Sequence, residues 1–249
     1  TFETGIYELG GHGIYLGPND IQIGKRESVH DVAKNLGRWA HGIVIRTFSH
    51  SNVTAFAEAA EIPVINGLDD LLHPCQALTD LFTLKEQKGT LRGLTLAWVG
   101  DGNNVAHSLM WACVKSGVNM NLAVPDGYGP DSEITAKVQK EASSKGVVVR
   151  ILRDPVEAVK DADAVYTDAW ASMGQESEAE ERKRIFKPYQ VNARLMGESK
   201  PAALFMHCLP AHRGEEVSGD VIDSSRSIVF EQAENRLHVQ KAIMLQLMK

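Results

Sequence analysis

Two kinds of hydrophobic pattern alternate along the chain. Short apolar runs, rich in β-branched residues and too short for helices, predict seven strands at 42–48, 62–66, 94–99, 121–124, 147–152, 164–167 and 203–207. Longer segments, with apolar residues every three or four positions, predict helices at 28–41, 52–60, 74–88, 104–116, 132–145 and 234–248. This alternation is typical of α/β proteins with parallel sheets.

The length of the chain bounds its domain organisation. At roughly 150 residues per domain, a chain of 249 residues forms one large or two small domains. The segment Lys88–Gly93 ends a predicted helix and precedes a new strand, so it is the best candidate for a boundary between two domains. We therefore predict two doubly wound parallel-sheet domains, at 1–88 and 89–231, joined by interdomain helices, with 232–249 returning to the first domain.

Composition and charge exclude several classes of partner. Lys and Arg number 26 against 32 Asp and Glu, giving a formal charge of −6, and there is no long basic run. Nucleic acids and anionic membranes are therefore disfavoured as partners. No apolar stretch is long enough for a spanning helix. Three widely spaced cysteines make a poor disulfide framework, so we expect a cytoplasmic protein.

A glycine-rich turn, Gly100–Asn104, follows the third predicted strand and opens a helix. It suggests a dinucleotide-binding turn, with Asp126 as a weak ribose partner, and hence an NAD-dependent dehydrogenase. However, Val105 stands where that fingerprint requires a small residue. A tight strand-to-helix turn would explain the glycines but not the two successive Asn residues, whose amides suit a polar ligand.

The last predicted strand runs into His207–Gly214, which places Cys208 at a strand end. Three interpretations are open for this thiol. It could be a nucleophile beside a base, a zinc ligand together with His212, or a buried structural cysteine.

Other polar residues also stand at the ends of predicted elements. His73 precedes Pro74 at a helix start, which is a natural anion site. Arg46 lies in an otherwise apolar strand, where burying it without a partner is costly. Asp168 and Arg236 likewise lie at element ends, and each of these residues could instead form an ordinary salt bridge. In parallel sheets ligands bind beyond the carboxyl ends of the strands, so the clustering favours a site.

Five motifs together resemble the ornithine carbamoyltransferases. They are HPCQ at 73–76, DGNN at 101–104, DAWASMGQE at 168–176, HCLP at 207–210 and AENR at 233–236. HPxQ is shared with the wider aspartate/ornithine carbamoyltransferase superfamily, whereas the SMG segment and HCLP point to the ornithine enzymes. The resemblance implies transfer of the carbamoyl group of carbamoyl phosphate to the δ-amine of L-ornithine in arginine biosynthesis, giving citrulline and phosphate, without a metal or organic cofactor.

The resemblance also implies the roles of individual residues. The carbamoyl-phosphate site would comprise Arg46, His73, Gln76, Cys208, Leu209 and Arg236. The ornithine site would comprise Asn104, Asp168, Ser172 and Met173. The catalytic residues would be Cys208, Asp168, His73 and Arg236.

The family resemblance further implies a particular backbone and assembly. The Leu209–Pro210 peptide bond would be cis, and the protein would be a homotrimer or a multiple of trimers, with His12 reaching a neighbouring site. The domain at 1–88 would bind carbamoyl phosphate and the domain at 89–231 ornithine.

One departure from the family pattern concerns the start of the chain. Family members carry an S-x-R-T-R phosphate-binding motif just ahead of the segment that Thr1–Gly5 resembles, and the sequence begins after it, without Met. We therefore expect a processed or truncated start and an incomplete first domain. The sequence does not decide whether this form is active. A non-catalytic ornithine-binding or assembly fragment and, less favoured, an NAD-dependent dehydrogenase are the alternatives.

Overall fold

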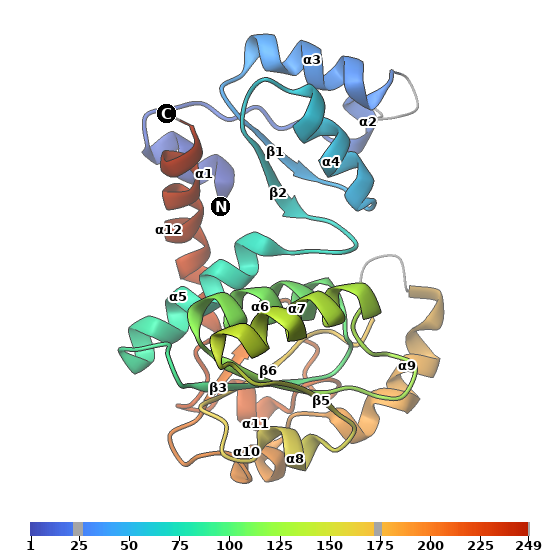
Figure 1. Cartoon of the computed structure of the whole chain (residues 1–249), viewed down its shortest axis with the longest axis vertical. Coiled ribbons are helices and arrows are strands. Elements are labelled where there is room, and N and C mark those ends of the chain that lie inside the picture. Colours follow the sequence, from blue (N-terminus) through green and yellow to red (C-terminus); the bar gives the residue numbers. More distant parts are fainter. Residues whose placement is uncertain (22–26, 172–175, 249) are drawn as a thin grey trace. The chain divides into compact units, whose positions relative to one another are not determined.

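The computed structural model describes residues 1–21, 27–171 and 176–248. The chain forms two compact units, one of Thr1–Cys75 with Glu234–Lys249 and the other of Gln76–Ala233. Each unit contains its own sheet, and all strand pairs within both sheets are parallel (Figure 1). The predicted fold class of two parallel-sheet α/β domains is therefore confirmed.

The first unit is built on a two-stranded sheet. Its elements are α1 (Phe2–Glu8), α2 (Pro18–Ile21), α3 (Val29–Trp39), β1 (Ile43–Arg46), α4 (His50–Ala59), β2 (Val64–Leu68) and most of α12 (Val229–Leu247). Helix α3 begins where Ser28 accepts a hydrogen bond from the Asp31 N–H. Apolar residues of α3, α4 and β1 form the core, among them Ala33, Ile45 and Phe56.

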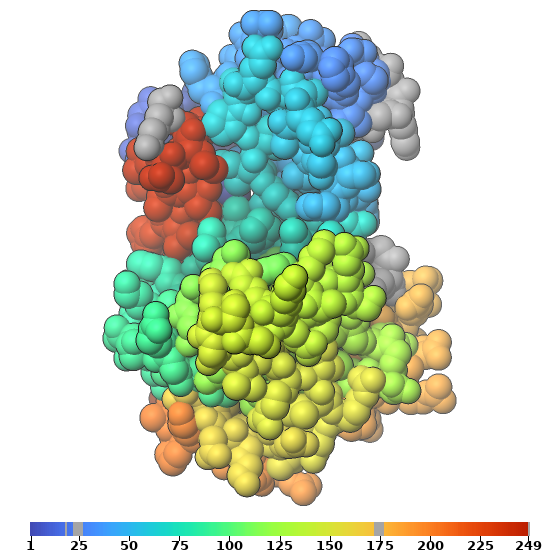
Figure 2. Space-filling view, in the orientation of Figure 1, coloured from blue at the N-terminus to red at the C-terminus, as the bar shows by residue number. Residues whose placement is uncertain are grey.

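The C-terminal helix packs against the first helix of the chain within this unit. Figure 2 shows the red C-terminal residues beside the dark blue first residues. Lys241 Nζ lies 2.8 Å from Glu8 Oε2. A Cβ at Gly5 would lie 3.0 Å from Lys241 and 3.1 Å from Met244, so the two helices approach closely. This contact fixes the last residues of the chain to its first helix.

The second unit is a doubly wound sheet of five parallel strands in the order β5-β4-β3-β6-β7. Its strands are β3 (Thr95–Val99), β4 (Asn119–Ala123), β5 (Val149–Leu152), β6 (Ala164–Thr167) and β7 (Leu204–His207). Its helices are α5 (Pro74–Lys88), α6 (Asn104–Ser116), α7 (Ser132–Lys145), α8 (Pro155–Val159), α9 (Ala179–Phe186), α10 (Ala193–Gly197) and α11 (Gly219–Ile222), with 3₁₀ turns η1 (Glu176–Glu178) and η2 (Lys187–Tyr189).

The strand order places a topological switch point between β3 and β6. From β3 the chain moves outward to β4 and β5, and it then returns to the other side of β3 to form β6 and β7. Figure 1 shows α6 and α7 over one face of the sheet and α8, α10 and α11 over the other. Because ligands of such sheets bind beyond the carboxyl ends of the strands at the switch point, the residues after β3 and β6 are the first candidates for a site.

All seven predicted strands and all six long predicted helices are present, with shifts of a few residues at their ends. Helices α1, α2, α8, α9, α10 and α11 are not anticipated by the sequence pattern. Each has between four and eight residues. A helix this short completes at most about two turns, so it leaves too few positions for a 3.6-residue period to stand out. Among the described residues, no helix has the length and apolar character needed to cross a membrane.

We expect Gly102→Ala to destabilise the second unit by about 1–3 kcal/mol, the usual cost of overpacking. A Cβ at this position would lie 2.7 Å from Pro130 Cδ and closer still to backbone atoms of Gly129 and Pro130. The matched control is Gly129→Ala, because a Cβ at Gly129 has no heavy atom within 4 Å. Urea unfolding of both variants tests this, and equal stabilities would contradict it.

Candidate functional site

The switch point of the second unit brings Asp168 and Cys208 together. Asp168 follows β6 and Cys208 follows β7, and these neighbouring parallel strands pair with Thr167 opposite His207. The Cys208 thiol donates to Asp168 Oδ1 over 3.0 Å, and Asn103 Nδ2 donates to Asp168 Oδ2 over 2.8 Å. Both oxygens of the half-buried carboxylate therefore have a partner from another strand end.

Asn103 is held by the start of helix α6. Its Oδ1 accepts the N–H groups of Val105 and Ala106 at 3.0 and 3.1 Å, as an N-cap does. With the oxygen so used, the amide nitrogen points to Asp168. The resemblance implies that Asn104 binds ornithine, and the structure shows that its neighbour Asn103 contacts Asp168. The N-cap preference of Asn at a strand-to-helix turn is the signal that could have identified it.

A buried ion pair anchors the segment that follows Asp168. Arg182 donates to the Asp101 carboxylate and to the Trp170 carbonyl. Its guanidinium carbon also lies 4.8 Å from the centroid of the Tyr128 ring. Arg182 and Asp101 are both buried. Asp101 of the DGNN motif is therefore an anchor for the chain after Asp168, a role that the sequence did not indicate.

The turn after β7 is organised by His207 and Glu216, whose side chains are fully buried. His207 Nδ1 accepts the Leu209 N–H over 2.8 Å, and its Nε2 lies 3.2 Å from Glu216 Oε1. Burial opposes ionisation of Glu216, but His207 and the His212 N–H outweigh it and lower the pKa of Glu216. Leu209 is thereby held at φ +58°, and the Leu209–Pro210 bond is cis, as the resemblance implies.

Asp168, His207 and Cys208 place possible metal-ligand atoms within 4.8 Å of one another. However, His207 Nδ1 accepts the Leu209 N–H and its Nε2 faces Glu216, so both ring nitrogens already have contacts that organise the turn after β7. In the described part of the chain, His212 groups with Glu215 and Glu216 and not with Cys208. The geometry therefore gives no support to a zinc site shared by Cys208 and His212.

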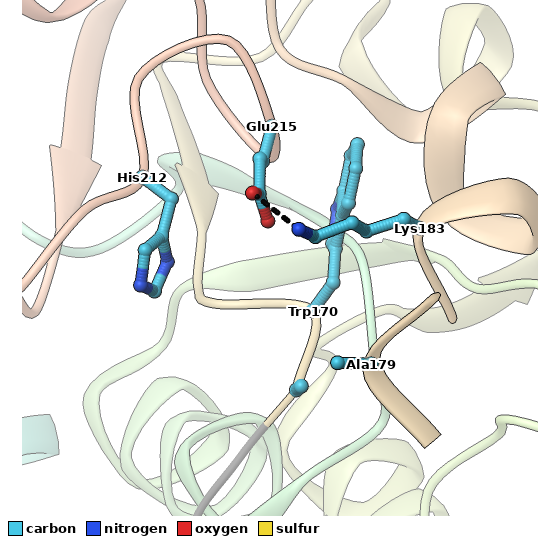
Figure 3. Close-up of a pocket in the computed structure, with 6 residues that line it drawn as sticks. Trp170, Ala179, Lys183, His212 and Glu215 are labelled. Atoms are coloured by element: carbon cyan, nitrogen blue, oxygen red, sulfur yellow. Dashed lines mark ion pairs between the residues drawn. The ribbon is translucent and has the colours of Figure 1, made fainter. Parts of the chain in front are cut away.

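A pocket of about 260 Å³ lies beside this site (Figure 3). It is lined by Trp170, Ala171, Ala179, Lys183, His212 and Glu215. Lys183 Nζ lies 2.9 Å from Glu215 Oε1 across it, and this contact raises the pKa of Lys183. Ser172 and Met173, predicted to bind ornithine, lie outside the described residues. Ala171, which directly precedes them, lines the pocket.

In the first unit, the segment before helix α5 is shaped by the buried Asp69. Its Oδ1 accepts the N–H groups of Leu71 and Leu72 at 2.9 and 2.6 Å. Its Oδ2 lies 2.7 Å from both Asn66 Nδ2 and His50 Nδ1. One carboxylate thus fixes the turn that leads into the HPCQ motif.

His73, the first residue of that motif, is 6% exposed. Burial, followed by the positive charges of Arg236 and Arg46, lowers the pKa of His73 to about 3. The ring is therefore neutral at pH 7. Arg46 and Arg236, which are also predicted for carbamoyl phosphate, are therefore close enough to His73 to act on it electrostatically.

The remaining predicted residues occupy different environments. Arg46 is exposed at the end of β1, so the expected cost of burying an Arg in this strand does not arise. Gln76 is fully buried on helix α5, and its Nε2 donates to Asp80 Oδ1 over 2.7 Å. Leu209 is half-buried beside Cys208, and His12 is exposed.

The second unit thus carries a carboxylate and a thiol at its switch point, and the first unit carries two arginines whose charges act on the buried His73. The carbamoyl-phosphate-binding domain model of the aspartate/ornithine carbamoyltransferases matches residues 1–86, and the Asp/Orn-binding domain model matches residues 92–247. The chain belongs to the aspartate/ornithine carbamoyltransferase family. The glycine-rich turn is therefore part of a carbamoyltransferase and not of a dehydrogenase.

Individual relatives indicate which enzymes of this family the chain is similar to. The ornithine carbamoyltransferase of Thermococcus kodakarensis is 56% identical over 98% of this chain and 78% of its own length. The structure of the Pyrococcus furiosus ornithine carbamoyltransferase matches with a TM-score of 0.96 and 52% identity, over 99% of this chain and 79% of that one. The Gloeobacter violaceus enzyme of the same name matches with a TM-score of 0.90 and 44% identity, over 100% and 80%.

We expect His73 to make stability depend on pH in a defined window. A folded-state pKa of about 3 lies below the ordinary 6.5, so the unfolded chain binds the proton first. The neutral His73 therefore contributes to the free energy of unfolding. This contribution is fully present above pH 6.5 and is lost as the pH falls towards 3, and its upper limit is about 5 kcal/mol. The unfolding free energy of the parent chain should thus fall more steeply over this window than that of His73→Gln. Parallel curves, or an NMR titration of His73 near pH 6.5, would contradict this.

Proposed function

We propose that this protein transfers the carbamoyl group of carbamoyl phosphate to the δ-amine of L-ornithine, giving L-citrulline and phosphate. The observation that carries the proposal is the contact of Cys208 and Asn103 with the two oxygens of Asp168 at the switch point. A carboxylate beside a thiol offers acceptors to an amine, and the relatives that match nearly the whole chain are named ornithine carbamoyltransferases.

The first unit would bind carbamoyl phosphate. This substrate is a dianion, so the guanidinium groups of Arg46 and Arg236 can hold it through charge-assisted hydrogen bonds and stabilise the departing phosphate. A neutral His73 can donate an N–H to the carbamoyl oxygen as negative charge develops there. Gln76, Cys208 and Leu209 would complete the contacts to the carbamoyl group.

The second unit would bind ornithine and position its amine. Asp168 would accept from the amine, while Asn104, Ser172 and Met173 would hold the rest of the molecule. The amine must be neutral to attack, although its ordinary pKa is near ~10. The new C–N bond forms at the carbamoyl carbon as the C–O bond to phosphate breaks. In this scheme Cys208 is a polar ligand of the amine and forms no covalent intermediate.

The proposal extends to assembly and location. We place the reaction in the cytoplasm and in a homotrimer, or a multiple of trimers, in which His12 reaches a neighbouring site. Exposed apolar side chains in the first unit, Trp39 at 77% and Phe48 at 60%, suit a subunit interface.

We expect the chain, preceded by an S-x-R-T-R segment from a relative, to carbamoylate ornithine in preference to aspartate and putrescine. A wrong amine leaves buried polar groups of the site without partners, which can change kcat/KM by a factor of 10⁴ or more, as an order of magnitude. Citrulline formation and phosphate release, measured for each amine, test this. Phosphate release with aspartate at a comparable kcat/KM would contradict the choice of substrate.

We expect Cys208→Ser to lower ornithine turnover roughly 10- to 100-fold while leaving measurable activity, because the hydroxyl can still donate to Asp168. Cys208→Ala removes the donor and should lose more. The control is Cys113→Ala, a buried cysteine in helix α6, which should change turnover by less than about twofold. Detection of a carbamoyl-thiol adduct by mass spectrometry during turnover would show instead that Cys208 is a nucleophile.

A further inference from the structure

A turn of the second unit gathers one imidazole and two carboxylates. His212, Glu215 and Glu216 each place a possible metal-ligand atom within 4.8 Å of the other two. All three follow β7 on one short stretch of chain, so the sequence H-x-x-E-E supplies the whole group. The proposed carbamoyl transfer uses none of these side chains.

Hydrogen bonds within the second unit hold this turn in shape. The Glu215 N–H donates to the His212 carbonyl over 2.9 Å, and the Gly214 N–H donates to the Val217 carbonyl over 2.8 Å. Gln190 Nε2 donates to the carbonyls of Gly214 and Glu215 at 2.9 and 2.8 Å. The turn therefore keeps its spacing without a bound ion, which is what a preorganised site requires.

Glu216 carries a buried oxygen that lacks a hydrogen bond. Its side chain is fully buried, and its Oε1 accepts the His212 N–H and lies 3.2 Å from His207 Nε2. In the described part of the chain, Oε2 has no hydrogen-bond donor. Burial opposes ionisation, but the donors to Oε1 lower the pKa of Glu216, so the side chain is charged near neutral pH. A charged oxygen left in this state is costly, and it points to a positively charged ligand.

The distance between Glu216 and His212 suits an ion that both side chains bind. His212 Nδ1 lies 3.5 Å from Glu216 Oε2. Two ligand atoms at about 2.0–2.2 Å from a tetrahedral Zn²⁺ lie about 3.4 Å from each other. Without an ion, a protonated imidazole at this distance makes only a long ion contact with the carboxylate.

The pocket of about 260 Å³ shown in Figure 3 gives an ion access to this group, because His212 and Glu215 both line it. Their side chains are 54% and 34% exposed. Lys183 Nζ contacts Glu215 Oε1 over 2.9 Å, and Figure 3 shows His212 on the other side of Glu215. When the imidazoles are neutral, the two carboxylates outweigh this one lysine, so the group retains a negative charge that attracts a cation.

We propose that His212, Glu215 and Glu216 form a binding site for a divalent transition-metal ion, and that Zn²⁺ is the ion that suits their ligand types. One imidazole nitrogen and two carboxylate oxygens hold the ion, and water from the pocket completes its coordination. This inference does not rest on the proposed function. It also differs from the zinc hypothesis raised by the sequence, because Cys208 is not a ligand.

The central test is isothermal titration calorimetry of the chain with Zn²⁺ in a Cys208→Ala background. This background removes the nearby thiol, which can bind zinc by itself. We expect one Zn²⁺ per chain. Adding His212→Ala should weaken binding by at least roughly 100-fold, and adding Glu215→Gln, which keeps the size of the side chain, by at least about 10-fold.

The matched control is His238→Ala in the same background. His238 Nε2 lies 3.7 Å from Glu234 Oε1, four positions away, and its side chain is 53% exposed, against 54% for His212. The pair differs in that Glu234 is largely exposed, whereas Glu216 is fully buried. Removing His238 should change the affinity for Zn²⁺ by less than about twofold.

A second measurement uses Co²⁺ with the unchanged chain. We expect a visible spectrum typical of nitrogen and oxygen ligands, without a thiolate charge-transfer band, and we expect it to disappear in Glu215→Gln. Circular dichroism establishes that each variant is folded, and His212→Gln replaces His212→Ala if the latter does not fold. The absence of Zn²⁺ binding in the Cys208→Ala chain, equal affinities of the His212 and His238 variants, or a thiolate band with Co²⁺ would each overturn the site.

Discussion

The parallel pairing of β6 between β3 and β7 is the constraint on which the site of the second unit depends. Thr167 lies opposite His207, so the residues that follow them, Asp168 and Cys208, leave the sheet side by side. The turn after β3 supplies Asn103 from the other flank. A slip of one residue in the pairing of β6 with either neighbour would turn alternate side chains to the opposite face and separate the carboxylate from the partner on that side.

Three buried carboxylates support this arrangement, because each holds a segment of the backbone in place. Asp69 fixes the turn before helix α5, Asp101 the chain after β6, and Glu216 the turn after β7. Each has its own donors within the protein, and each is buried. Asp168 differs because it is only half-buried at the strand ends, where a ligand can reach it. Among these four carboxylates, the three that are fully enclosed hold backbone segments, and Asp168 is the one that is partly exposed at the strand ends.

The sequence predicted the strands well because each is a short apolar run with clear boundaries. Asp168 and Cys208 could be selected because they directly follow such runs, and a parallel sheet gathers strand ends. The partners that hold them could not be predicted in this way. Asn103 lies 65 positions from Asp168, and Arg182, which anchors the chain after Asp168, lies 81 positions from Asp101. Only the folded chain brings these residues together, since no local pattern encodes such distant pairs.

Local chemistry explains two further differences between sequence and structure. In the DGNN motif the helix uses the first Asn as its cap, which leaves that residue facing Asp168, and a motif match alone does not tell the two Asn residues apart. Arg46 stands at the last position of a four-residue strand, and at that position a long side chain reaches solvent.

Gly102 changes how a glycine-rich turn is interpreted. In dinucleotide-binding folds such a glycine leaves room for a phosphate to approach the backbone. Here that room is taken by the protein's own chain, since the backbone of Gly129 and Pro130 fills the space in which a side chain would stand. A nucleotide could approach this turn only after the 129–130 segment had been displaced. A search for nucleotide sites based on glycine spacing alone would therefore select this turn wrongly. A search that also considered the loop after the next strand, which contains Gly129 and Pro130, would reject it.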